Sequence, residues 1–490
     1  MTRGPRRGAA NAGGGTGKRS AGQVRRRFWI AAALVVACAG VAGSLALRAR
    51  QRPRQPNVML VIVDTLRRDH VGVYGCRRPC TPTMDALGGE NVLFTNAYAN
   101  SNWTKPSVAS LFTGLYVSQH GVKYVVTGQS GELPVTQRLS EDAVTLAELM
   151  SAAGYDTIGI VENVHISAKM GFSQGFRVWD DSPYGATNVT NRFLDRSKEV
   201  KEPFFAYIHY FDPHTPYYRT RNFEGEGAVL PGLQEAKSTD YRWTAYTFGV
   251  DRGIIGLSAF ERRRLEDLYD GEVRNADTGI GRILATLRAR GMYDNTWVIV
   301  TADHGENFYE AKRLTHPHDC FSNPQMRIPL IMKMPESCGI RERIVADPVE
   351  LADILPTIAS YLGLDVPAGV VGADLTAAIL EGSPLGSRAI AAESEAGRML
   401  VAGKHKYVSV PTEVGNFSFV YDESADPLEE HNLADEDAAG AVRLAALFEE
   451  VNTEARRRQT VKPSSDVQLS REEVEKMKSV GYLQLGGGGR

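Results

Sequence analysis

Three short apolar runs, far apart in the chain, constrain the fold more than any other feature of this sequence. They span residues 57–63, 204–210 and 297–301. Their length and their β-branched and aromatic content predict buried strands, as in the large sheet of an α/β fold. Asp64 follows the first run at once, and Asp303 follows the last after one further residue. Because open α/β sheets bind ligands at the carboxyl ends of their strands, Asp64 is a candidate site residue. A strand-end turn or a helix cap would also account for this Asp.

Residues 102–114 predict a polar turn that leads into a short helix. Pro106 lies near the first helical position, apolar residues follow at helical spacing, and Gly114 is a typical stop. This pattern places Thr104 at the helix N-terminus, where unpaired N–H groups and the helix dipole favour an anion. Thr104 could be a nucleophile or simply an N-cap.

The amino-terminal region predicts a membrane anchor. Residues 1–27 form a Gly-, Ala- and Arg-rich stretch that predicts a disordered, basic, cytoplasmic tail. Residues 28–47 carry no charge and are long enough to span a bilayer as one helix, and residues 48–55 predict a linker. The arginines before the span predict export of everything after it. A cleaved twin-arginine signal, or lipoprotein cleavage before Cys38, would export the same domain.

Charge and cysteine content exclude some classes of protein. Twelve of the 56 Lys and Arg residues lie in residues 1–55, which contain no Asp or Glu, so the remainder holds 44 basic against 58 acidic residues. A globular part this acidic is a poor match for nucleic acid. The five cysteines define no disulfide framework and no zinc motif. Cys76 and Cys80 could close a small loop or remain thiols.

Other segments predict regular structure by periodicity and end signals. Helices are expected at 145–153, 261–290, 350–358, 438–458 and near 472–480, and strands at 157–161, 389–392, 398–401 and 407–410. Residues 219–259 have no assignable pattern.

Several motifs together resemble the sulfatase family of the alkaline phosphatase superfamily. They are Val63–Arg67 with Thr81–Asp85, the Thr104-Lys105-Pro106-Ser107 segment with Thr113-Gly114, Gln119–Gly121, Asp212–Tyr217, Asp303–Glu306, Arg327–Ile331, Glu350–Ile358 and Asp426–Glu429. The resemblance implies an α/β alkaline phosphatase-like fold with a large mixed sheet flanked by helices. It implies a catalytic domain at residues 56–384 and a smaller α+β subdomain with a flexible tail at residues 385–490.

The same resemblance implies a metal-dependent active site. Thr104 stands where the family has its nucleophilic Cys or Ser, and Asp64, Asp303 and His304 match the positions of metal ligands. With the Thr104 oxygen they form an O/N set for one divalent cation, for which Zn²⁺ is the best match and Mn²⁺, Mg²⁺ and Ca²⁺ are alternatives. Expected substrate-binding residues are Lys105, His214, His316 and His318, with His316 ranked above His318.

The chain also departs from the family pattern. Thr65 replaces the second of two consecutive Asp residues, Val108 replaces an Arg, and residues 161–165 lack a sulfate-binding Lys and His. Thr104 cannot be converted to formylglycine as Cys or Ser can. We therefore expect a membrane-anchored enzyme that cleaves or transfers an anionic phosphate ester of a headgroup or a sugar. A sulfuric ester hydrolase and an inactive binding protein are the alternatives.

Overall fold

The computed structural model describes residues 55–479 apart from 124–125, 128–132, 183–184, 218–240, 341–342, 460 and 463. Residues Gln55–Arg490 form one compact unit, which contains both the expected catalytic domain and the expected C-terminal subdomain. The expected membrane span at residues 28–47 lies outside the described part of the chain. Within that part, no helix is both long enough and apolar enough to cross a membrane.

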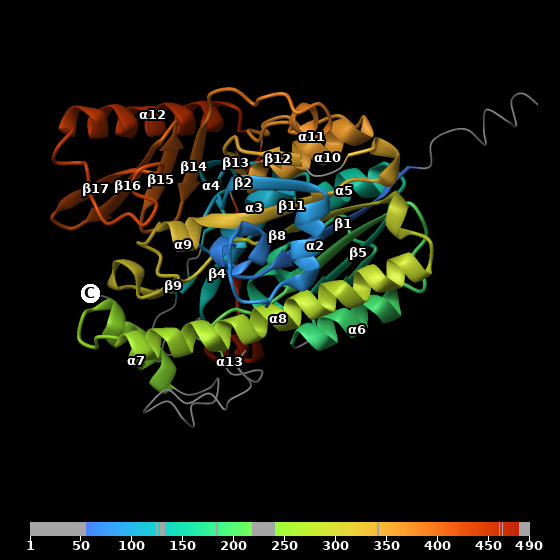
Figure 1. Ribbon diagram of the computed structural model, residues 1–490, viewed down its shortest axis with the longest axis horizontal. Coiled ribbons are helices and arrows are strands. Elements are labelled where there is room, and N and C mark those ends of the chain that lie inside the picture. The colour runs from blue at the N-terminus through green and yellow to red at the C-terminus, as the bar shows by residue number, and fades with distance from the viewer. Residues whose placement is uncertain are drawn as a thin grey trace, which may run out of the picture. The chain divides into compact units, whose positions relative to one another are not determined.

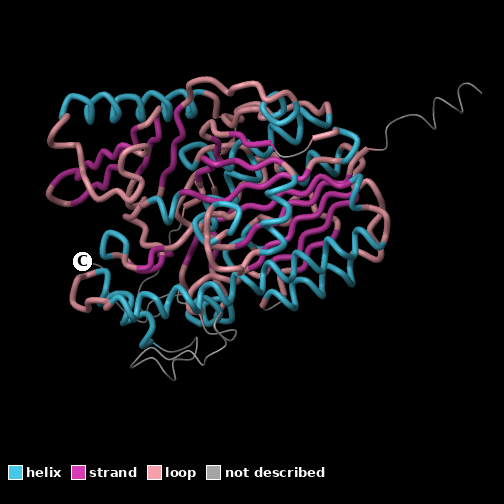
Figure 2. Tube along the Cα trace, viewed as in Figure 1, coloured by secondary structure: helices cyan, strands magenta, loops and turns pink. Residues whose placement is uncertain are grey.

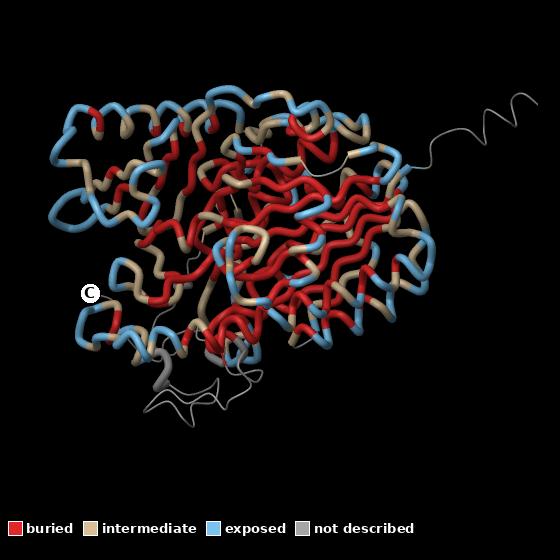
Figure 3. Tube along the Cα trace, in the orientation of Figure 1, coloured by how far each residue is buried: buried red, intermediate tan, exposed pale blue. Residues whose placement is uncertain are grey.

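A nine-stranded mixed sheet forms the centre of this unit (Figure 2). The strand order is β12-β2-β11-β8-β1-β7-β5-β6, with β13 also paired to β2. The strands are β1 (Asn57–Val63), β2 (Val92–Tyr98), β5 (Asp156–Val161), β6 (Val178–Asp180), β7 (Phe204–Tyr210), β8 (Thr296–Thr301), β11 (Arg327–Lys333), β12 (Arg343–Val345) and β13 (Val349–Glu350). The apolar runs 57–63, 204–210 and 297–301 form β1, β7 and β8, which are neighbours: β1 lies between the other two and runs parallel to both. Every residue of these three strands is buried (Figure 3), as their apolar sequences predict.

Helices cover the sheet, and the longest shows how the sequence selects its buried face. α8 (Ala259–Ala289) begins with a capping box between Ser258 and Glu261 and buries a stripe that includes Leu265, Ile280 and Leu287. α8 packs beside α6 (Ala186–Arg196), and Figure 1 shows the two running along the same side of the sheet. The other α-helices before the C-terminal sheet are α2 (Pro82–Glu90), α3 (Thr104–Thr113), α4 (Val117–His120), α5 (Leu146–Ala152), α7 (Tyr241–Asp251), α9 (Asn323–Met326), α10 (Ile354–Leu362) and α11 (Thr376–Leu380).

A second, four-stranded antiparallel sheet follows in the C-terminal part. Its strands β14 (Ala389–Glu393), β15 (Arg398–Ala402), β16 (His405–Thr412) and β17 (Gly415–Asp422) pair in chain order. α12 (Ala438–Arg457) packs on one face, where Phe448 joins Leu400, Tyr407 and Val420. After α12, β18 (Ser465–Gln468) pairs with β4 (Val135–Arg138), which in turn pairs with β3 (Val126–Thr127), and α13 spans Arg471–Ser479.

The helices and strands expected from periodicity are all present among the described residues, with small differences in their bounds. The elements α2, β2 and α6 were not expected from the sequence, and α7 lies within residues 219–259, to which the pattern assigned nothing. A second difference is small: the helix expected to start at Glu350 begins with a 3₁₀ turn, Leu351–Asp353, before α10.

Candidate active site

Four parallel strands bring their carboxyl ends to one edge of the central sheet. In the order β8, β1, β7, β5 they are consecutive neighbours. Asp303 follows β8, Asp64 follows β1, and Asn163 follows β5, while His209 is the penultimate residue of β7. All four side chains are buried, as expected for a site at the carboxyl edge of an α/β sheet.

Helix α3 starts at this edge and supplies Thr104. Trp103, in extended conformation, is the N-cap residue, and Thr104 is the first residue of the helix, which ends at Gly114 in the left-handed conformation. The helix therefore has the expected bounds, but Thr104 is not its cap. Instead, the Thr104 Oγ1 atom lies 3.5 Å from His304 Nε2 and 3.5 Å from Asn163 Nδ2.

The two aspartates each have one satisfied and one unsatisfied oxygen. Asp64 Oδ2 accepts hydrogen bonds from Asn163 Nδ2 (2.7 Å) and His209 Nε2 (3.0 Å). Asp303 Oδ1 accepts from the backbone N–H groups of Thr65 (3.1 Å) and His304 (2.9 Å). Asp64 Oδ1 and Asp303 Oδ2 are buried and have no hydrogen-bond partner among the described residues.

Such a pair of bare carboxylate oxygens requires a positive charge nearby. Burial raises the pKa of Asp64 well above its usual range, and the charge of Asp303 raises it further. A divalent cation between the two bare oxygens would satisfy both and remove the repulsion, so the donor set fits a metal ion.

His304 is oriented to join the same set. Its Nδ1 atom donates to the carbonyl of Gly305 (2.9 Å), which leaves the unprotonated Nε2 3.7 Å from Asp303 Oδ2. The predicted ligands are thus neighbours in pairs: Thr104 Oγ1 lies 3.5 Å from His304 Nε2, His304 Nε2 lies 3.7 Å from Asp303 Oδ2, and a carboxylate oxygen of Asp64 lies within 4.8 Å of one of Asp303.

His209 is a site residue that the sequence analysis missed. One ligand atom from each of Asp64, His209 and Asp303 lies within 4.8 Å of the other two, a spacing that could also hold a metal. His209 lies within the apolar run of residues 204–210, so the sequence indicates only a buried strand residue at this position. Strand pairing places His209 beside Ile62 of β1, two residues before Asp64, and the sequence alone does not show this pairing.

Two predicted substrate-binding histidines, His214 and His316, lie together, with ring centroids 4.8 Å apart. The His316 ring is 4.9 Å from that of His304, and its Nδ1 bonds to Glu306 Oε1 at 3.0 Å. His214 Nδ1 donates to the Thr215 carbonyl. Burial lowers the pKa of His316 to about 3, so this ring is neutral near pH 7. The pair thus forms a wall of imidazoles beside the ligand set.

Comparison with known proteins identifies the family. The model of the Sulfatase family matches residues 56–364. The chain belongs to the sulfatase family.

Individual sulfatase-family relatives cover most of the chain at low identity. Delta 4,5-hexuronate-2-O-sulfatase of Bacteroides thetaiotaomicron is 26% identical over 436 residues, which cover 79% of this chain and 86% of the relative. The structure of a 2-O GAG sulfatase aligns with a TM-score of 0.66 at 21% identity, over 84% of this chain and 95% of the other. A phosphonate monoester hydrolase of Agrobacterium radiobacter aligns with a TM-score of 0.64 at 21% identity, over 82% and 96%. The fold of this sulfatase-family hydrolase is thereby confirmed.

The structure shows the contacts of the residues that depart from the sulfatase pattern. Thr65 has φ 54° and uses its backbone N–H, not its side chain, to bind Asp303. Val108, in place of the family's Arg, is buried in α3. Asn163, from the segment that lacks the Lys and His pair, supports Asp64 instead.

Lys105 and His318 make other contacts in this sulfatase-family chain. The Lys105 amine donates to Thr136 Oγ1 (2.7 Å) and to the Gln137 carbonyl (3.1 Å). His318 stacks on Trp103 at 4.0 Å and pairs with Glu395. These contacts hold the start of α3 in place, and a direct role of either residue in substrate binding stays a prediction.

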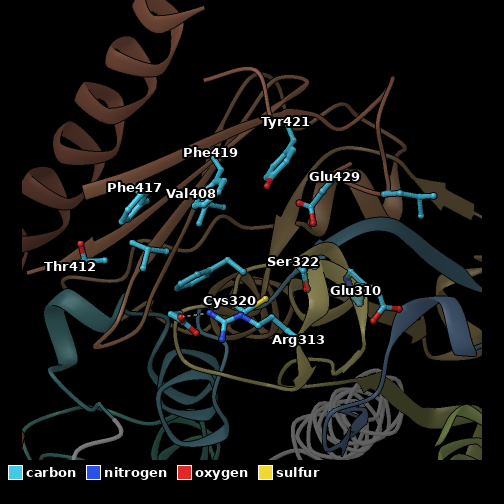
Figure 4. A pocket seen from close by; sticks show the side chains of 16 residues that line it. Glu310, Arg313, Cys320, Ser322, Val408, Thr412, Phe417, Phe419, Tyr421 and Glu429 are labelled. Atoms are coloured by element: carbon cyan, nitrogen blue, oxygen red, sulfur yellow. Dashed lines mark hydrogen bonds and ion pairs between the residues drawn. The ribbon is translucent and has the colours of Figure 1, made fainter. Parts of the chain in front are cut away.

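A separate cavity of about 400 Å³ lies between the C-terminal sheet and residues 319–324. Figure 4 shows Val408, Phe417 and Phe419 on the sheet side, opposite Cys320 and Arg313. Arg313 is paired with Asp319, so the charges in the wall are already compensated. None of the four predicted metal ligands lines this cavity, so it is distinct from the candidate metal site.

Proposed function

We propose that this sulfatase-family enzyme cleaves or transfers phosphate esters through a covalent intermediate on Thr104. The observation that carries the proposal is the placement of the Thr104 hydroxyl. It is buried, it does not cap its helix, and it lies 3.5 Å from both His304 Nε2 and Asn163 Nδ2, next to two bare carboxylate oxygens.

The residues support attack by a hydroxyl that has not been modified. A divalent metal held by Asp64, Asp303, His304 and Thr104 would lower the pKa of the Thr104 hydroxyl and neutralise charge on the ester. Asn163 donates one amide hydrogen to Asp64 and lies within 3.5 Å of Oγ1, where it can stabilise the developing negative charge. The positive end of α3 acts in the same direction.

The proposed reaction is an in-line displacement followed by a second one. The Thr104 hydroxyl loses its proton to solvent, a bond forms between Oγ1 and phosphorus as the bond to the leaving oxygen breaks, and the leaving oxygen takes up a proton from solvent. His316 and His214 lie beside the ligand set, where their rings can contact the bound ester. Water or an acceptor alcohol then attacks phosphorus and restores the threonine hydroxyl.

Side-by-side assays test this proposal. The full-length chain, purified in detergent and loaded with Zn²⁺ or Mn²⁺, is offered 4-nitrophenyl phosphate, bis(4-nitrophenyl) phosphate and 4-nitrophenyl sulfate. Thr104→Ala should abolish phosphoester cleavage, and acid quenching followed by mass spectrometry should find phosphate on Thr104 in the wild type. Thr113→Ala is the matched control, since Thr113 ends the same helix and its hydroxyl bonds only to backbone groups.

A sulfuric ester hydrolase is the second candidate, because the first relative above is itself named a 2-O-sulfatase. Cleavage of the sulfate ester alone would support this alternative. Phosphoester cleavage that persists in Thr104→Ala would refute the threonine mechanism.

We also propose that residues 28–47 anchor the enzyme with its catalytic part exported. The uncharged run and the arginines before it support this location. Protease added outside intact cells should digest the catalytic part but spare residues 1–27, and the reverse pattern would refute the proposed orientation.

A further inference from the structure

A hydrogen-bonded chain of three buried residues runs from the core to the candidate metal site. The Tyr207 hydroxyl lies 2.9 Å from His209 Nδ1, and His209 Nε2 lies 3.0 Å from Asp64 Oδ2. All three side chains are inaccessible to solvent. Neither Tyr207 nor His209 was among the residues expected from the sequence.

The position of the His209 ring proton can be assigned from its two hydrogen-bond partners, Tyr207 and Asp64. With a cation bound, Asp64 is ionised. If His209 Nδ1 carried the ring proton, the Nε2 lone pair would then face a carboxylate oxygen at 3.0 Å, and the Tyr207 proton would have no acceptor in this contact. The opposite tautomer satisfies every atom: the Tyr207 hydroxyl donates to Nδ1, and Nε2–H donates to Asp64. A ring nitrogen that carries a proton cannot ligate a metal, so the spacing of His209 alone is a misleading sign of a ligand.

The consequence for Asp64 is that one of its oxygens is withdrawn from coordination. Oδ2 is held by two donors, His209 and Asn163, and Oδ1 alone faces the site. The two oxygens of Asp303 differ in the same way: the backbone N–H groups of Thr65 and His304 occupy Oδ1, and Oδ2 has no hydrogen-bond partner among the described residues. Each carboxylate can therefore give a cation only one oxygen.

We propose that Tyr207 and His209 are positioning residues that fix Asp64 as a one-oxygen ligand and thereby select a cation of low coordination number. This inference rests on the metal-ligand set of the proposed function. The set then offers four protein atoms: Asp64 Oδ1, Asp303 Oδ2, His304 Nε2 and Thr104 Oγ1. Zn²⁺ accepts four mixed N and O ligands, whereas Ca²⁺ requires six to eight oxygens and often a two-oxygen carboxylate.

The test compares two tyrosines of the same strand. Tyr207 and Tyr210 both lie in β7, both are buried, and each hydroxyl makes a bond to a side chain; that of Tyr210 is to Thr190 Oγ1 (3.0 Å), outside the metal-ligand set. The full-length chain in detergent is stripped of metal and titrated with Zn²⁺ and with Ca²⁺ against a chelator of known affinity. Tyr207→Phe should weaken Zn²⁺ binding about 10- to 100-fold and bring the Zn²⁺ and Ca²⁺ affinities closer together. Tyr210→Phe should bind both ions as the wild type does.

A Co²⁺ spectrum separates positioning from ligation. With Co²⁺ as probe, His209→Gln should weaken binding but leave the position and intensity of the visible bands unchanged, because the bound atoms are the same. A changed spectrum would make His209 a ligand and overturn the proposal, as would wild-type Zn²⁺ affinity in Tyr207→Phe. None of these readouts uses an ester, so they can succeed even if the chain fails to cleave phosphoesters.

Discussion

Replacing Asp303 by Asn should stabilise the metal-free protein, although it removes a proposed catalytic metal ligand. In the absence of a cation, Asp64 and Asp303 place two negative charges within 4.8 Å of each other in a buried site. At an effective dielectric constant near 20, two unit charges at that distance repel by about 3 kcal/mol. The raised pKa of Asp64 lets the wild type relieve part of this by taking up a proton. We therefore expect a gain of about 1–3 kcal/mol, which is a rise of a few degrees in Tm.

The local bonds indicate that Asn fits at position 303. Its carbonyl oxygen can accept from the N–H groups of Thr65 and His304, as Asp303 Oδ1 does, and its amide can donate to Asp64 Oδ1. The assay is calorimetry of the full-length chain in detergent, first with EDTA and then with Zn²⁺. Saturating Zn²⁺ should stabilise the wild type by about 4 kcal/mol at a thousand times Kd, and the variant much less.

Asp353→Asn provides a control that should lower the free energy of unfolding, whereas Asp303→Asn should raise it. Asp353 is also buried, but Arg388 compensates its charge with two bonds of 2.6 and 2.9 Å. The same substitution there should destabilise the protein by about 2–3 kcal/mol, because it weakens a buried ion pair. A metal-free Asp303→Asn protein that is no more stable than the wild type, or that still gains fully from Zn²⁺, would refute the reasoning.

Three further results are expected. His316→Ala should lower kcat/KM for 4-nitrophenyl phosphate by about 10-fold, because its ring lies beside that of His304 in the site; an unchanged kcat/KM would exclude His316 from substrate binding. Burial lowers the pKa of His70, but the hydrogen bond to Asp270 and the charges of Asp69 and Asp270 together outweigh burial and raise this pKa above 6.5. The free energy of unfolding should therefore fall as the pH rises from 6.5 through the folded-state pKa of His70, and the variant His70→Gln should lack this slope in Tm measured against pH. Thr145→Ala removes the capping box with Glu148 at the start of α5 and should cost about 1 kcal/mol in urea unfolding, with an unchanged m-value.

Local signals in the sequence were sufficient for the core of the fold. β1 and β7 have the bounds that their apolar runs predict, and α3 ends at its glycine. α7 escaped prediction because its sequence has no clear amphipathic period, and contacts made far away in the chain help to hold it. Asp251, its last residue, accepts the backbone N–H of Leu314 and a bond from Arg313.

Some residues of the site could be predicted from the local sequence, and others could be identified only from the order of the strands. Asp64 and Asp303 could be found because each follows a strand that is recognisable by itself. His209 and Asn163 could not, because their role depends on which strands are neighbours: β7 lies between β1 and β5, and this order places both residues against Asp64. Nothing in the residues around His209 distinguishes a support for a metal ligand from an ordinary buried histidine.

The departures from the sulfatase pattern are consistent with one another once their contacts are considered. A second Asp at position 65 would add carboxylate oxygens as ligands, and Thr65 has no carboxylate. Asn163, in the segment without the Lys and His pair, occupies one oxygen of Asp64. Both changes reduce the number of oxygens that a cation can bind. Asp64 Oδ1 and Asp303 Oδ2 remain buried without a hydrogen-bond partner among the described residues, which destabilises the metal-free protein. A protein that binds no metal would gain nothing from keeping them. This combination argues against a decayed site and for one rebuilt around a cation with few ligands and an unmodified threonine.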